Sequence, residues 1–249
     1  MTTHPFHDGL RRACGVLAAA LAILASAPAS ADMGDDTIYG MFLVEQLEYG
    51  YNSRANPVSW DAMGWVGGDW NRLWFKTEGE TSTDALEVEG EAQLLYSRLI
   101  GAYWEFQVGL RGDLIASEDG RHGRGHLSIG LEGVAPYWFE LAPTIFVSHE
   151  GDVSFRVHAS IDLYITQRLL VEPSAEINAA IQAVPEFGVG AGFNDFELGL
   201  RLRYELAREF APYIGVNWRQ SFGETADLVR AKGGAATDVQ AVIGVRFWL

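Results

Sequence analysis

The chain has 249 residues, enough for one large β-domain or two smaller ones. Its formal net charge is −15, with 18 Lys and Arg residues against 33 Asp and Glu residues, which argues against nucleic acid as a partner because phosphates need a basic surface. The single cysteine, Cys14, lies in an N-terminal segment that we expect to be removed, so the mature chain excludes disulfides, thiolate metal sites and cysteine nucleophiles.

That N-terminal segment has the pattern of a secretory signal peptide. Arg11 and Arg12 form a positive region, residues 16–24 are apolar but too short to span a membrane, and Ala29-Ser30-Ala31 resembles a cleavage site. The sequence therefore predicts export across the inner membrane and cleavage after Ala31.

Three parts of the chain follow from this prediction. Residues 1–31 are the cleaved signal peptide, residues 32–38 are a short acidic lead, and residues 39–249 are the folded domain. No stretch after the signal has the 18 or more apolar residues of a transmembrane helix. An exported chain of this kind is periplasmic, secreted, or an outer-membrane barrel.

Residues 60–80 read as a β-hairpin with a Gly-Gly-Asp turn at residues 67–69. The second strand alternates Leu73, Phe75 and Thr77 on one face with Arg72, Trp74, Lys76 and Glu78 on the other. A period of two is typical of a strand. In a soluble sandwich the apolar face would point inward, whereas in a membrane barrel it would point outward.

The rest of the chain repeats this alternation. The predicted strand segments are residues 40–51, 85–96, 99–114, 126–134, 137–149, 153–165, 169–179, 196–204, 210–220 and 237–249. Short connections are predicted at residues 67–69, Ser97, Ala135, 166–167 and 207–208, and long ones at residues 118–123, 180–193 and 223–236. Alternating short turns and long loops are typical of outer-membrane barrels.

The sequence therefore predicts an all-β fold, a transmembrane antiparallel up-and-down β-barrel of about twelve strands with a charged and polar lumen. A soluble β-sandwich is the alternative, but its core could not hold so many large inward side chains. We expect the barrel to lie in the outer membrane, with its apolar faces in contact with lipid.

Charged residues on the polar faces predict a ladder inside the lumen. Glu87, Glu89 and Glu91 repeat at about 7 Å, two residues of strand rise. Lys76 and Arg72, on the preceding strand, are expected opposite Glu87 and Glu91. Such a ladder either stiffens a narrow barrel through mutual pairing or binds a cation.

Four histidines remain after the signal peptide: His122, His126, His149 and His158. Imidazole is a ligand for Cu and Zn, although a histidine in a polar lumen can also be purely structural. No pair among the four has diagnostic metal spacing. The chain also lacks a G-x-S-x-G motif and a nucleophile–base–orienter set, so we expect no enzymatic activity.

The sequence resembles the outer-membrane copper resistance protein B family over nearly the whole mature chain. The resemblance rests on FLVEQLEYG (42–50), WDAMGWVGGDWNRLWFKTEGE (60–80), EGEAQLLYSR (89–98), GLRLRYELAREFAPYIGVNW (199–218) and VRFWL (245–249). It implies a role in copper tolerance, by binding copper or assisting its export or sequestration at the outer membrane, with a periplasmic multicopper oxidase as a partner.

Members of this family often carry a Met- and His-rich segment before the barrel, but the lead here is DMGDDT, with Met33 as its only thioether. No such motif is left to carry a ligand assignment from the family, so for a copper-handling barrel the ligands we expect are the lumen residues His126, His158 and Glu132 and the loop residues His122 and His149. The alternative function is a structural or general diffusion barrel without metal selectivity.

Overall fold

The computed structural model describes residues 37–52, 56–82, 88–117 and 120–249. The strands are β1 (Tyr39–Tyr51), β2 (Pro57–Gly67), β3 (Asn71–Ser82), β4 (Val88–Gly101), β5 (Trp104–Ser117), β6 (Gly120–Ala135), β7 (Phe139–Ser148), β8 (Val153–Ser160), β9 (Leu163–Tyr164), β10 (Leu169–Ala180), β11 (Gly192–Tyr204), β12 (Phe210–Ser221) and β13 (Thr237–Trp248). The helices are the short 3₁₀ turns η1 (Pro136–Trp138) and η2 (Pro185–Phe187) and the α-helix α2 (Gly223–Ala231).

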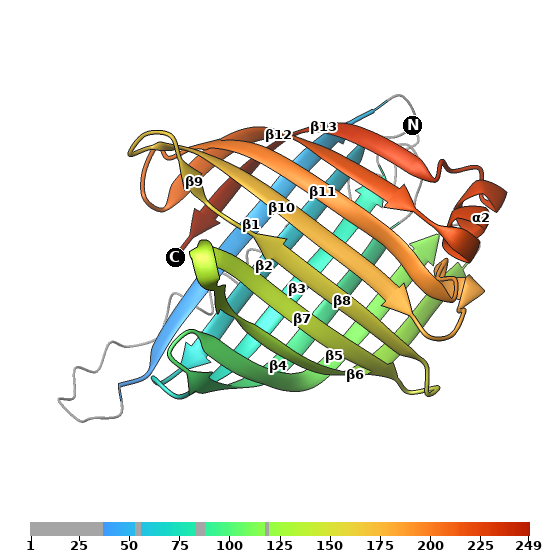
Figure 1. The fold of residues 1–249 in the computed structure, drawn as a ribbon, viewed down its shortest axis with the longest axis horizontal. Helices are drawn as coiled ribbons and strands as arrows, with labels where there is room; N and C mark the ends of the chain where they lie inside the picture. The colour runs from blue at the N-terminus through green and yellow to red at the C-terminus, as the bar shows by residue number, and fades with distance from the viewer. Residues whose placement is uncertain (1–36, 53–55, 83–87, 118–119) are drawn as a thin grey trace, which may run out of the picture. The chain divides into compact units, whose positions relative to one another are not determined.

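The strands close into a barrel. Each pairs antiparallel with its neighbours along the chain, β13 pairs with β1, and the pairing of β10 with β11 leaves no free edge (Figure 1). The short β9 follows β8 and pairs with the same strand, β10, so the two occupy one place in the wall. The barrel thus has twelve strand positions, as the sequence predicted.

The barrel is apolar outside and polar inside. Leu110 and Leu200, on the outer face, are 66% and 54% exposed, whereas Glu48 and Arg203, on the inner face, are each 2% exposed. Lipid is the medium in which such an outer face is stable, and closure satisfies every strand edge within it. The predicted inside-out fold is confirmed.

The hairpin of β2 and β3 has the predicted orientation. Leu73 and Phe75 are 47% and 48% exposed on the outer face, while Trp74 between them is 7% exposed in the lumen. Trp65 of β2 lies directly opposite Trp74, and their ring centroids are 6.2 Å apart. Aromatic rings therefore occupy lumen space that a wide pore would leave to water.

Two predicted connections are wrong. Ser97 is not a turn but lies within β4, where it is 1% exposed and faces the lumen; the turn follows at residues 102–103. The expected polar loop at residues 118–123 is mostly strand, because β6 begins at Gly120 and pairs with β5 up to Ser117. In both places small or polar residues sit on a lumen face, where polarity does not signal a loop.

The connections have different lengths at the two rims. The rim that holds the start of β1 and the end of β13 has the turns after β2, β4, β6, β9 and β11, which we call the short-turn rim. The opposite rim, the long-loop rim, carries the β10–β11 loop and the β12–β13 connection, which contains α2 (Figure 1). Within the described residues, no helix is long and apolar enough to cross a membrane.

Candidate functional site

The lumen is crossed by ion pairs, and those near the short-turn rim centre on two buried arginines of β11. Arg201 donates to Glu48 at 2.6 Å and to Gln46 at 3.0 Å, both on β1. Arg203 pairs with Glu172 of β10 and, at 2.6 Å, with Asp162. Because these charges are buried, their pairing is what makes their burial tolerable.

Arg72 and Lys76 of the predicted ladder do face the lumen, but their expected partners are wrong. The register of β3 with β4 places Arg72 opposite Ser97 and Lys76 opposite Gln93. Arg72 instead pairs with Glu105 of β5 at 2.5 Å, and Lys76 reaches past β4 and β5 to Glu132 of β6. Long side chains in a barrel pair across the lumen as well as along the sheet, so strand register alone did not identify their partners.

The acidic residues of that ladder lie opposite other acidic residues on the neighbouring strands. Glu91 lies opposite Glu78 of β3 and Asp113 of β5, and Glu89 lies opposite Glu80. Glu87 lies outside the described residues. A row of carboxylates thus follows adjacent strands, and the arginines that neutralise it come from β5 and β8.

Arg156 of β8 is the cation at the middle of this row. Its Nη1 lies 2.5 Å from Glu78 Oε1 and its Nη2 lies 3.1 Å from Glu91 Oε2, while its Nε lies 3.5 Å from Glu176 Oε1 on β10. Arg111 of β5 holds the same Glu91 at 2.5 Å. The network therefore joins both sides of the lumen.

His126 of β6 continues this network into a cavity of about 80 Å³ near the long-loop rim. Its Nδ1 lies 3.5 Å from Asp113 Oδ2, and Asp113 also accepts from Arg111 at 2.6 Å. His126 is 8% exposed, and its buried Nδ1 has no hydrogen-bond partner among the described residues. A nitrogen of this kind is available to a ligand that enters the cavity.

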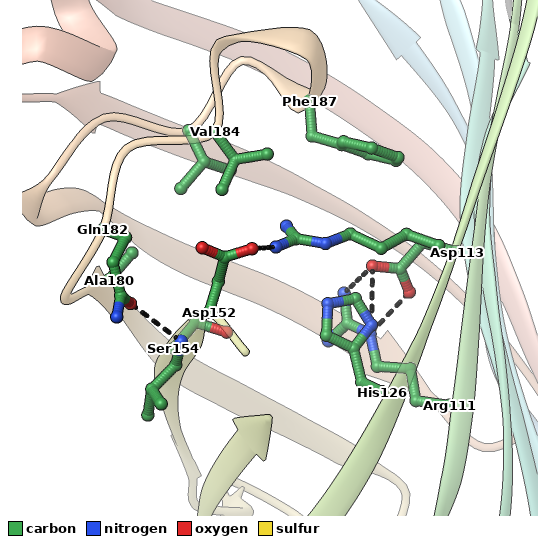
Figure 2. Close-up of a pocket in the computed structure, with 12 residues that line it drawn as sticks. Arg111, Asp113, His126, Asp152, Ser154, Ala180, Gln182, Val184 and Phe187 are labelled. Carbon is green, nitrogen blue, oxygen red and sulfur yellow. Dashed lines mark hydrogen bonds and ion pairs between the residues drawn. The ribbon is translucent and has the colours of Figure 1, made fainter. Parts of the chain in front are cut away.

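The β10–β11 loop covers the cavity. Figure 2 shows Val184 and Phe187 on the loop side, opposite His126, with Asp152 between them. Asp152 forms an ion pair with Arg124, which also lines the cavity. The Phe187 ring lies 5.5 Å from the Arg124 guanidinium carbon.

The loop is in turn fastened to α2. Thr225 Oγ1 accepts from the Gly190 amide at 2.9 Å and from Asn194 Nδ2 at 2.8 Å, and Glu224 accepts from the Ala191 amide at 3.0 Å. These contacts hold the loop over this side of the lumen.

The other expected ligands do not join His126 in one cluster. His158 of β8 lies opposite Glu176, and Glu132 is engaged by Lys76. His122 lies on β6 and not in a loop, while His149 lies in the β7–β8 turn with its side chain 59% exposed. Across the described parts of the chain, no three His, Cys, Asp or Glu side chains are grouped as metal ligands. The five residues therefore do not form one site.

Sequence reasoning missed Arg156 as the centre of the network and Phe146 as its support. Phe146 of β7 is 3% exposed in the lumen, and its ring centroid lies 4.4 Å from the Arg111 guanidinium carbon and 5.7 Å from that of Arg156. The signal was available, because Phe146 has the same parity as Ser148, which faces the lumen.

Comparisons with known proteins identify the family. The family model described as copper resistance protein B precursor (CopB) matches residues 38–249. A copper resistance protein B from Escherichia coli is 40% identical over 214 residues, which cover 86% of this chain and 71% of the relative. A copper resistance protein B homolog from Pseudomonas syringae pv. tomato (strain ATCC BAA-871 / DC3000) is 33% identical with the same coverage.

A solved NanC porin structure aligns with a TM-score of 0.54 at 14% identity, covering 83% of this chain and 98% of the porin. That likeness shows a shared barrel fold. The fold and the family together place the protein in the outer membrane, in contact with lipid. The chain belongs to the copper resistance protein B family, and its role is copper resistance.

Proposed function

We propose that this protein binds copper ions within its lumen and assists their export or sequestration at the outer membrane. Family membership carries the copper role. The lumen supports binding because its carboxylates attract cations and because imidazole nitrogens are good copper ligands.

The His126–Asp113 pair is the first contact that we assign to copper. The Nδ1 atom of His126 is buried and without a hydrogen-bond partner in the described chain, and it borders the cavity beneath the β10–β11 loop. A carboxylate 3.5 Å away adds an oxygen donor of opposite charge to the ion. His122 and His149, at the long-loop rim, would deliver the ion to this pair.

His158 is the second contact, deeper along the same network. It lies opposite Glu176, which also approaches Arg156 at 3.5 Å. Glu132 is a weaker candidate, since copper would have to displace Lys76 from it.

A periplasmic multicopper oxidase would receive or oxidise the ion at the short-turn rim. Co-purification of the two proteins from copper-grown cells tests that partnership.

Calorimetry on the refolded mature protein tests the two histidine contacts. We expect His126→Ala to lower copper affinity more than His122→Ala, a matched change at the exposed rim of the same strand, and His158→Ala to lower it further in combination. Binding that is unaltered by both lumen substitutions would remove His126 and His158 from the proposal.

Growth across a copper series tests the role in the cell. We expect a deletion strain to lose copper tolerance, the intact gene to restore it, and the His126→Ala/His158→Ala gene to restore it only in part. A general diffusion barrel is the competing function, and full rescue by the double variant would favour it. The Arg156–Glu78 ion pair across the lumen and the Trp65 and Trp74 rings on its wall argue against a wide pore.

A further inference from the structure

We propose that Arg156 closes the lumen to ion flow and sets which sign of charge passes when the lumen opens. This inference goes beyond copper handling, because it concerns every small ion that enters the barrel.

The argument begins with the span of its ion pairs. In the closed ring of twelve strand positions, β8 lies five positions from β3 and four from β4, and six positions would be diametrically opposite. Arg156 pairs with Glu78 of β3 and Glu91 of β4, so its side chain joins nearly opposite walls. The other lumen ion pairs of the described residues join walls at most three positions apart, as Lys76 with Glu132 and Arg201 with Glu48 do.

The contacts of Arg156 hold it in this extended position. The Nη atoms reach Glu78 at 2.5 Å and Glu91 at 3.1 Å on the far wall, while Nε reaches Asn178 at 3.3 Å on the strand beside its own. Its side chain is 18% exposed, and the Phe146 ring lies 5.7 Å from its guanidinium carbon. The guanidinium of Arg156, held by acceptors on both walls, therefore blocks the cross-section of the lumen at this depth.

The charges around Arg156 predict selectivity. Three carboxylates approach it, those of Glu78, Glu91 and Glu176. Arg111, which also pairs with Glu91, supplies a second positive charge. Rings of carboxylates select cations in channels. Without the Arg156 charge, the same section would be open, wet and negative, so it would pass cations and repel anions.

Planar-bilayer recordings in potassium chloride test this inference. We expect small currents from the wild type, and from Arg156→Gln a several-fold rise in conductance with the reversal potential in a salt gradient shifted toward cation selectivity. Arg219→Gln is the matched control, because it removes the same charge from an ion pair with Glu197 that joins only neighbouring strands. Equal conductance of the two variants, or a large wild-type current, would overturn the proposal.

The loss of Arg156 leaves carboxylates unpaired and can impair folding. The double variant Arg156→Gln/Glu78→Gln restores part of the charge balance, and it must also conduct more than the Arg219→Gln control if the arginine closes the lumen. Folding of each variant is checked by its heat-modifiable migration on gels. Because the recordings contain no copper, their outcome is independent of whether His126 and His158 bind the metal.

Discussion

Ser97 connects three strands through one hydroxyl group. It accepts a hydrogen bond from Trp74 Nε1 at 3.0 Å and donates one to Glu105 Oε2 at 2.9 Å, and the other oxygen of Glu105 holds Arg72. All of this lies inside the barrel, where a polar atom without a partner costs more than a hydrogen bond contributes. Small polar residues of the lumen therefore have stabilising roles that their size does not suggest.

Replacing Ser97 by Ala should destabilise the barrel. The Trp74 N–H would lose its acceptor and Glu105 one of its donors, at a cost of about 1–3 kcal/mol. Urea unfolding of the refolded protein in micelles measures the difference. Ser160→Ala is the control, since the described structure shows no hydrogen bond from that hydroxyl. Equal midpoints for the two variants would contradict this account of Ser97.

The sequence identified the face of most residues but not their partners. Strict alternation is enough to direct Lys76 and Glu132 inward, because a one-residue slip would expose a charge to lipid. Their pairing depends on how far a side chain reaches across a curved wall, which no local pattern contains. The same limit applies to the metal candidates: His126 and His158 were recognised as lumen residues, but the separation between them was not predictable.

Glycines of β3 and β4 make room for a tryptophan on the barrel wall. Gly79 lies opposite both Trp60 and Gly90. A Cβ atom at Gly79 would lie 2.4 Å from Trp60 Cζ2 and 2.6 Å from the Glu89 carbonyl oxygen, whereas one at Gly90 would come no closer than 3.4 Å to the same ring. The Trp60 ring therefore packs directly against Gly79 but leaves room for a methyl group at Gly90.

Gly79→Ala should therefore destabilise the barrel where Gly90→Ala does not. The first substitution forces the Trp60 ring and a strand backbone apart, and overpacking of this kind costs about 1–3 kcal/mol. Thermal unfolding followed by tryptophan fluorescence measures both the stability and the displacement of the ring. The idea fails if the two alanines prove equally harmful.

The elements were predicted to different degrees. Residues 169–179 anticipated β10 closely and residues 196–204 anticipated the end of β11, because their apolar faces alternate without interruption, but β11 begins four residues earlier, at Gly192. The helix α2 was missed inside a predicted loop, although Glu224 near its start and Arg230 near its end complement a helix dipole. A helix of nine residues held by its neighbours gives a weak periodic signal.

The whole barrel has an apolar outside and a charged inside, so substitution by Arg should be costly on the outer face and tolerated on the inner face. Leu110, at the middle of β5, is 66% exposed on the outer face. Gln240 of β13 faces the lumen and donates to Asp238 at 2.8 Å.

Leu110→Arg should destabilise the barrel in bilayers by about 2–4 kcal/mol, since its charge would lie near the bilayer midplane. Gln240→Arg should leave stability nearly unchanged, because its new charge lies beside Asp238. Folding titrations into lipid vesicles measure both. A tolerated arginine at residue 110 would contradict the orientation of the wall.

The barrel closes where Leu249 and β13 meet β1. Leu249 exchanges two backbone hydrogen bonds with Phe42, at 3.1 and 2.8 Å, beside the pairing of β13 with β1. Until β13 pairs with β1, a chain in transit through the periplasm has two unpaired strand edges and an exposed apolar outer face, and both favour aggregation in water. Biogenesis of this protein therefore depends on timing: the chain needs protection in the periplasm until β13 has paired with β1, and a variant that cannot form the Leu249–Phe42 contact would depend on that protection for longer.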